Sequence, residues 1–332
     1  MPIVNKENST GIVANVLHPV LYVQGAKGEM TVSTDQPEKH LYFKLLNLTA
    51  EDFGDPEFKR NYGLRYALYG GSCTDSHIAI ALGKAGCMGA YDSDGVQPDV
   101  VAREIDNMKS ALGELPFLIK MHANQNADTQ MRLVHLLIEK NVTGVEASGF
   151  TDPTAALLRF RLNGIREEDG KIVIPHKIIA GVSREEILEK FVSPPDPVLV
   201  ASLLENGYIT TQEAALAPRI PVVDDITVEA DSLVSTLPAL VAHCNRIQTQ
   251  FGYQQKVRVG AGGDIGTGAG CLAAFEMGAA YVAADSVIHG CADFAHVSDM
   301  AMLLLKSCAY RYMKNLLLRI GAAPCDFRDD IL

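Results

Sequence analysis

The chain has 332 residues, of which 48% are hydrophobic and 21% are charged. This composition is too apolar for a disordered protein, and the length is enough to bury a sizeable core. The formal net charge of −11 disfavours nucleic acid and an anionic membrane surface as partners, because both attract Lys and Arg. We expect neither partner.

The N-terminus and the cysteines indicate a cellular compartment. Residues 1–6, Met-Pro-Ile-Val-Asn-Lys, do not begin an apolar signal sequence, and no apolar run reaches transmembrane length. The seven cysteines are scattered and include no Cys-x-x-Cys pair. Neither a disulfide framework nor a zinc site is therefore predicted. We expect a cytoplasmic protein with buried, reduced thiols.

Residues 1–60 are polar and irregular, which predicts an N-terminal extension. From residue 64 onward, short apolar runs alternate with helical stretches of ten to fifteen residues. The predicted strands are 64–69, 87–91, 117–121, 144–148, 177–180, 226–230, 257–261 and 280–284. The predicted helices include 76–85, 99–112, 128–140, 152–162, 237–251 and 268–277.

This alternation predicts an α/β fold, a single (β/α)8 TIM barrel formed by residues 61–183 and 222–332. Strands that are apolar on both faces are typical of a parallel sheet covered by helices. Residues 184–221 break the alternation, because they contain Pro194, Pro195 and Pro197 but no strand. We expect a small helical insertion that caps the barrel mouth, the end at which the strands terminate and where such barrels hold their chemistry. An elaborated crossover connection is the alternative.

Several motifs resemble one known family. The run 257–267, Val-Arg-Val-Gly-Ala-Gly-Gly-Asp-Ile-Gly-Thr, with 273–282 behind it, is similar to the seventh-strand signature of nitronate monooxygenase and PfaD flavoproteins. Further segments resemble PfaD itself and follow in the same order, namely 80–86, 144–148, 178–184, 191–194, 204–210 and 224–232. The resemblance covers roughly residues 55–298, and the ordered motifs make it specific.

The resemblance implies a trans-acting enoyl reductase of polyketide and polyunsaturated fatty-acid synthases, with FMN at the barrel mouth. Its implied partners are an acyl carrier protein and a small-molecule acyl substrate. The resemblance leaves open whether the protein forms a homodimer. Carrier proteins are acidic, so we expect local basic patches despite the negative net charge. The candidate clusters are Arg159, Arg161, Arg166, Lys171 and Lys177, and Arg311, Lys314 and Arg319.

The glycine-rich turns that hold the FMN phosphate in this family are altered here. The family pattern Gly-Gly-Ile-Gly-Thr is replaced by Gly263-Asp-Ile-Gly-Thr, and the later Gly-Ser is replaced by Asp285-Ser286. Asp264 and Asp285 therefore place carboxylates where a phosphate dianion would bind. The alternative is that both are solvated helix N-caps. We interpret Gly262, Gly263, Gly266 and Ser286 as the vestige of a phosphate site.

The part of the site that would face the flavin ring also departs from the family. Gly181 stands where the family has the lysine that stabilises reduced flavin. A histidine-containing loop expected after Ser232 is missing, and acids replace glycines at Asp92 and Asp94. We therefore expect no cofactor, with FMN as the alternative.

The replacements gather acids and a histidine at predicted strand ends. The candidate catalytic residues are His122, Asp285, Asp264, Glu146 and Asp92, with Asp94, Glu229 and His289 in the same layer. Clustered carboxylates repel one another, so some should have raised pKa values and could act as acid or base. A solvated rim and, less favoured, a divalent-cation site are the alternatives; we expect no metal.

Three functions follow from this pattern. The first is cofactor-independent acid–base chemistry on an acyl thioester held by a carrier protein: dehydration, double-bond isomerisation or cyclisation. The second is the FMN-dependent enoyl reductase that the resemblance implies. The third is a non-catalytic partner in a synthase. We favour the first.

Overall fold

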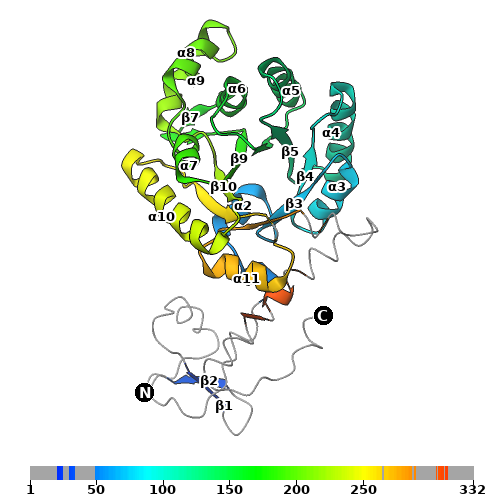
Figure 1. Ribbon diagram of the computed structural model, residues 1–332, viewed down its shortest axis with the longest axis vertical. Helices are drawn as coiled ribbons and strands as arrows, with labels where there is room; N and C mark the ends of the chain where they lie inside the picture. Colours follow the sequence, from blue (N-terminus) through cyan, green and yellow to red (C-terminus); the bar gives the residue numbers. More distant parts are fainter. Residues whose placement is uncertain are drawn as a thin grey trace.

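The computed structural model describes the strands Leu21–Gln24 (β1) and Met30–Ser33 (β2), residues 49–263 and 265–285, and residues 288, 304, 306–309 and 311–312. Eight parallel strands close into a barrel in the order β10-β11-β12-β3-β4-β5-β6-β9 (Figure 1). These strands are β3 (Leu68–Cys73), β4 (Met88–Asp92), β5 (Phe117–His122), β6 (Gly144–Ser148), β9 (Lys177–Val182), β10 (Asp225–Val228), β11 (Arg258–Ala261) and β12 (Val282–Ala284). The predicted TIM barrel is confirmed, and each predicted strand overlaps an observed one.

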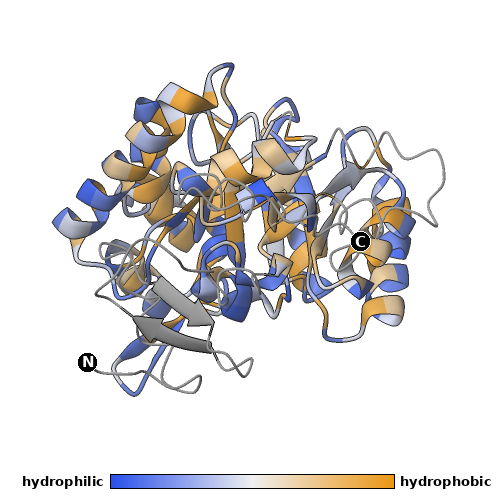
Figure 2. Ribbon diagram, turned by 90° about the horizontal axis from the view of Figure 1, so that it is seen from below, coloured by the Kyte–Doolittle hydropathy of each residue, from blue (hydrophilic) through white to orange (hydrophobic). Residues whose placement is uncertain are grey.

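Helices surround the barrel between its strands. They are α3 (Ser76–Lys84), α4 (Pro98–Leu112), α5 (Ala127–Glu139), α6 (Ala155–Leu162), α10 (Leu233–Phe251) and α11 (Gly268–Glu276). Polar side chains cap the first turns of α3, α5, α6 and α11, as where Asn126 accepts the N–H of Thr129 at the start of α5. Hydrophobic residues lie on one side of the helices and hydrophilic residues on the other (Figure 2), so the apolar sides cover the strands.

The segment between β9 and β10 is helical, as predicted. It contains α7 (Glu185–Val192), α8 (Pro197–Glu205) and α9 (Thr211–Leu216). Helix α8 packs beside α6, and α9 contacts β7 (Arg166–Glu168), which forms an antiparallel hairpin with β8 (Lys171–Val173). Contact with the mouth is seen at Lys190, whose Nζ bonds Thr151 and Asp152 in the loop after β6. The expected cap stays a prediction.

The barrel is filled from its underside, the end at which the strands begin. Helix α2 (Pro56–Tyr62) lies there, and its Phe58 ring stacks on Tyr281 with centroids 4.2 Å apart. The Tyr281 ring in turn lies over Gly260, where a Cβ atom would come within 2.4 Å of it. Tyr69 and Tyr281 both bond the hydroxyl of Thr227, at 2.8 Å and 3.0 Å, in the middle of the barrel. The interior is therefore a packed core, not a channel.

The burial of side chains corrects the expectation for Arg161 and agrees with the expectation for the cysteines. Arg161 was expected in a basic surface patch, but its side chain is fully buried and bonds Asp224 and the carbonyl oxygen of His176. The first basic cluster therefore lacks this cation. Four cysteines of the described residues are buried free thiols, namely Cys87, Cys244, Cys271 and Cys308. No helix of the described part of the chain is long and apolar enough to cross a membrane.

Candidate active site

Five polar side chains come from neighbouring strand ends at the mouth. Asp92 ends β4, Lys120 and His122 lie at the end of β5, Glu146 lies on β6, and Asp285 directly follows β12. Asp92 is in register with Lys120, and Lys120 is in register with Glu146. Residues two apart on a strand share a face, so Lys120 and His122 point to the same side.

Lys120 joins two carboxylates into what we call the Lys120 network. Its Nζ lies 3.3 Å from Glu146 Oε1 and 3.7 Å from Asp285 Oδ2. Ser72, on β3, bonds both acids, because its hydroxyl donates to Glu146 at 3.1 Å and its N–H donates to Asp285 at 3.2 Å. Glu146 is 3% exposed whereas Asp285 is 33% exposed, so only the second acid is open to a substrate.

Burial sets the charges of this network. It raises the pKa of Glu146 to about 7, because the attraction of Lys120 only partly offsets desolvation and the nearby Asp285 and Glu229 add repulsion. Burial alone would lower the pKa of Lys120, but Glu146, Asp285 and Glu229 outweigh it and raise that pKa. Lys120 is therefore an ammonium ion at neutral pH, and Glu146 exchanges its proton near pH 7.

His122 and Asp92 form a pair at the rim of the mouth. His122 Nε2 lies 2.9 Å from Asp92 Oδ1, and each side chain is 21% exposed. The hydrogen bond to Asp92 raises the pKa of His122, with further support from the charges of Asp92 and Asp94. Partial burial would raise the pKa of Asp92, but the bonds from His122 and from the Asp94 N–H outweigh it and lower that pKa. The pair therefore favours an imidazolium next to a carboxylate.

Glu229 fills the space at Gly181, on the neighbouring strand. A Cβ atom at Gly181 would meet three atoms of the Glu229 carboxylate at 3.2–3.3 Å. Glu229 is exposed at the mouth, and partial desolvation raises the pKa of its carboxylate, opposed by Lys120 and reinforced by Asp285. The position at which the resemblance expects a lysine is thus next to a carboxylate.

The glycine-rich turn after β11 leads into α11. Gly263 has a φ of +86°, which favours glycine, and apart from its chain neighbours no atom of the described residues lies within 4 Å of where its Cβ would be. Thr267 caps α11 by accepting the N–H of Gly270 at 3.1 Å. Gly262 and Gly266 belong to the same turn. Asp264, Ser286 and His289 lie outside the described residues.

The site was predicted in part. The structure pairs His122 with Asp92 and joins Glu146 to Asp285 through Lys120, while the catalytic roles of these residues stay predictions. Lys120 and Ser72 were not predicted. The available signal for Lys120 was its place two residues before His122, on the same face of one strand. Within the described residues, no group of three His, Cys, Asp or Glu side chains is arranged to hold a metal ion.

Comparison with known proteins shows that the chain is similar in sequence to proteins of polyunsaturated fatty-acid and polyketide synthesis. The chain is 34% identical over 275 residues to a polyunsaturated fatty acid synthase subunit of Thraustochytrium sp., a match that covers 78% of the chain and 18% of that protein. It is 33% identical over 274 residues to the polyketide biosynthesis protein PksE of Bacillus subtilis, covering 78% of the chain and 36% of PksE. No family model matches the chain.

Among solved structures, the chain is similar to the enoyl reductase domain of MlnA, from the macrolactin biosynthesis cluster of Bacillus amyloliquefaciens. The TM-score is 0.69 at 30% identity, over 71% of this chain and 56% of that one. The chain is a homologue of PfaD-type synthase subunits. The predicted resemblance is confirmed. This PfaD-like chain spans little more than a third of PksE and less than a fifth of the Thraustochytrium protein.

Proposed function

We propose that this PfaD-like barrel acts on an acyl thioester held by an acyl carrier protein, through acid–base chemistry that needs no cofactor. The candidate reactions are dehydration, double-bond isomerisation and cyclisation, each of which moves protons near the α-carbon that the thioester activates. The Lys120 network carries the proposal, because it sets an ammonium ion between a buried carboxylate and an exposed one.

The groups that line the mouth have roles that their charges support. In a dehydration, Asp285 takes a proton from the α-carbon, and the Lys120 ammonium, 3.7 Å away, stabilises the negative charge on the thioester oxygen. His122, as imidazolium, gives a proton to the β-hydroxyl group, which leaves as water. The proton on Asp285 then returns through solvent to His122. In an isomerisation, His122 instead protonates the γ-carbon.

Glu146 and Asp92 support the groups that transfer protons or stabilise charge. Glu146 holds the charge of Lys120 and exchanges its own proton near pH 7 beside Asp285. Asp92 keeps His122 oriented and cationic. Asp264 remains a candidate by its position in the turn after β11.

The mouth does not fit FMN. The family lysine that would face reduced flavin is Gly181 here, and the Glu229 carboxylate occupies the adjacent space. Asp285 adds negative charge near the second phosphate turn, and like charges a few ångströms apart cost on the order of a few kcal/mol. These contacts support a barrel without flavin.

The partner that we propose is the acyl carrier protein of a synthase complex. Its support is that the homologues are subunits of polyketide and polyunsaturated fatty-acid synthases. Because Arg161 is buried, the second basic cluster is the better docking candidate. Its Arg311 is exposed, whereas Lys314 and Arg319 lie outside the described residues.

Turnover of a carrier-bound 3-hydroxyacyl thioester tests the proposal, with product followed by mass spectrometry. We expect activity without NAD(P)H and a bell-shaped pH profile, because one group must be protonated while another is not. His122→Ala or Asp285→Asn should lower turnover by about two to four orders of magnitude, the usual effect of losing a positioned acid or base.

Matched controls change exposed side chains on outer helices. His135→Ala on α5 and Asp106→Asn on α4 should leave turnover unchanged. If the mouth variants keep full turnover and NAD(P)H proves essential, the acid–base proposal is wrong. The similarity to the MlnA domain then favours the second candidate, an FMN-dependent enoyl reductase. Carrier binding without turnover in any of these assays would instead indicate a non-catalytic partner.

A further inference from the structure

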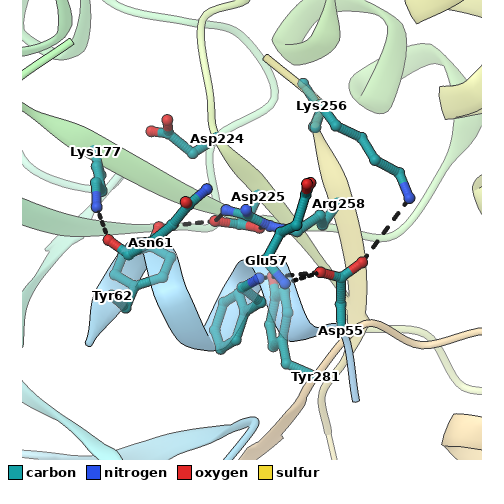
Figure 3. Close-up of polar contacts among 12 residues, drawn as sticks. Asp55, Glu57, Asn61, Tyr62, Lys177, Asp224, Asp225, Lys256, Arg258 and Tyr281 are labelled. Atoms are coloured by element: carbon teal, nitrogen blue, oxygen red, sulfur yellow. Dashed lines mark hydrogen bonds and ion pairs between the residues drawn. The ribbon is translucent and has the colours of Figure 1, made fainter. Parts of the chain in front are cut away.

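A pocket of about 320 Å³ lies on the underside of the barrel, at the opposite end from the mouth, and Figure 3 shows several of the side chains that line it. We call it the underside pocket. It is bounded by α2, by the starts of β9 and β11, and by the turn between α10 and β11. Its lining includes Glu57, Arg60, Asn61, Lys177, Asp224 and Lys256. The volume is within the range that small-molecule ligands occupy.

Lys177, the first residue of β9, is a half-buried cation without an acidic partner. Its Nζ donates to the carbonyl oxygen of Asn61 and lies 4.6 Å from the centre of the Tyr62 ring. Among the described residues, it forms no ion pair with a carboxylate within 4.0 Å. Burial lowers its pKa. A desolvated charge in this state is costly unless something pairs with it.

The acids nearest to Lys177 are already engaged by arginines. Asp225 accepts two bonds from Arg258, at 2.6 Å and 2.8 Å, and a third from Tyr62 at 2.8 Å. Asp224 accepts bonds from the Arg161 guanidinium and from the Ile178 N–H. Each aspartate is therefore neutralised by its own arginine, and the charge of Lys177 is left over.

Two more cations border the pocket and are loosely held. Arg60 is 3.5 Å from Glu57, and Lys256 is 3.9 Å from Asp55. Four cations line the pocket, Arg60, Lys177, Lys256 and Arg258, against two acids, Glu57 and Asp224. With the ion-pair partners Asp225, Asp55 and Arg161 included, the balance is five cations against four acids. A local positive excess stands out in a chain of net charge −11.

We propose that the underside pocket binds the phosphate group of a small molecule, with Lys177 as the paired charge. A phosphate dianion can accept bonds from several donors at once, which suits an ammonium on one side and a guanidinium on the other. Asn61, Gln254 and Gln255 supply amides for the rest of the ligand. This site is separate from the mouth and independent of the chemistry proposed there.

The test uses the full chain with labelled lysine side chains, inorganic phosphate as the probe and NMR as the readout. We expect a saturable change in the Lys177 signal and a rise in its pKa, because a bound anion favours the ammonium form. Lys177→Met should weaken binding by at least about tenfold, the usual effect of losing a charged hydrogen bond. Arg60→Gln, at a side chain 69% exposed, should also weaken binding and does not threaten the fold.

Lys190→Met is the matched control, since Lys190 lies on α7 and pairs with Asp152 outside the pocket. It should bind phosphate like the wild type. Equal affinity of the wild type, Lys177→Met and Arg60→Gln would overturn the proposal. A response to phosphate at Lys120 in the mouth, without any change at Lys177, would overturn it as well.

Discussion

Among single residues, Lys120 has the largest influence on the charge of the mouth. It lies between Glu146 and Asp285 and also attracts Glu229, so three carboxylates share one ammonium ion. The shared cation does not offset the desolvation of all three acids, so the pKa of Glu229 is raised and that of the most deeply buried acid, Glu146, is raised to about 7. Unequal burial thus separates the protonation states of acids that share one site.

The raised pKa of Glu146 predicts a pH-dependent stability. The folded pKa of about 7 exceeds the ordinary value of 4.5, so between these values the folded state holds a proton that the unfolded state releases. This stabilisation is present below pH 4.5 and is lost as the pH rises through 7. Glu146→Gln stays uncharged, so the wild type should lose about 3 kcal/mol relative to the variant over this range.

Urea unfolding at a series of pH values measures this difference. The exposed Glu114→Gln is the control, and its free energy of unfolding should follow that of the wild type at every pH. A difference between Glu146→Gln and wild type that does not change with pH would mean that Glu146 is ionised in the folded barrel.

The sequence predicted the rim pair better than the network beneath it. His122 and Asp92 stand at strand ends, where polar residues are conspicuous, and the structure brings them within 2.9 Å. Lys120 lies inside the predicted strand 117–121, where a long amphipathic side chain is compatible with either face of a strand. Ser72, on β3, reaches Glu146, on β6, although two strands lie between them in the barrel, so only the tertiary structure brings them together.

Among the elements, α2 determines how the underside of the barrel is closed. Its N-cap Asp55 accepts the N–H groups of Glu57 and Phe58, and Gly63, with a φ of +68°, ends the helix. In between, Phe58 packs on Tyr281, and Tyr62 donates to the buried Asp225. The short helix thus covers the apolar ring stack and partners a buried charge.

Removal of the Phe58 ring should therefore destabilise the whole barrel. The side chain is fully buried, and Phe58→Ala should lower the free energy of unfolding by about 3–5 kcal/mol through lost burial and a cavity. Chemical denaturation measures the loss. Glu57→Ala, one residue away on the exposed side of α2, should change it by less than about 0.5 kcal/mol. Comparable small effects for both variants would mean that α2 does not pack on the barrel.

Elements with a strong pattern were predicted, and those defined by tertiary contacts were not. The barrel strands were recognised because apolar runs recur between helices. The sequence did not predict the hairpin β7–β8, because Arg166–Glu168 is charged and exposed. On β8, the backbone N–H of Ile172 donates to the side chain of Gln254 and not to a third strand. Helix α10 begins four residues before the predicted start at 237, since Pro238 forfeits only one hydrogen bond near the helix start.

In the molecule as a whole, the two ends of the barrel differ in charge. The mouth gathers Asp92, Glu146, Glu229 and Asp285 around one lysine and one histidine. The underside has a positive excess around Lys177. An anionic ligand is therefore favoured at the underside and disfavoured at the mouth, which is the reverse of what FMN in the mouth would require.

This asymmetry predicts the behaviour of the protein toward flavin. Protein purified without added flavin should be colourless, and titration with FMN should show no tight binding, because Asp285 and Glu229 add negative charge where the resemblance would put the phosphate and the reduced ring. If charge is the main obstacle, Asp264→Gly combined with Asp285→Gly should improve FMN affinity by about a hundredfold, which corresponds to about 3 kcal/mol. Flavin fluorescence and visible absorbance measure both.

The control removes the same amount of charge elsewhere. Asp106→Asn combined with Glu139→Gln, at exposed positions on α4 and at the end of α5, should leave FMN affinity unchanged, since screening weakens charges far from the mouth. An equal gain in both double variants would point to net charge and not to the mouth. A stoichiometric flavin band in the wild-type protein would contradict the prediction outright, because a barrel that retains FMN through purification must accommodate the phosphate despite Asp285 and the ring despite Glu229.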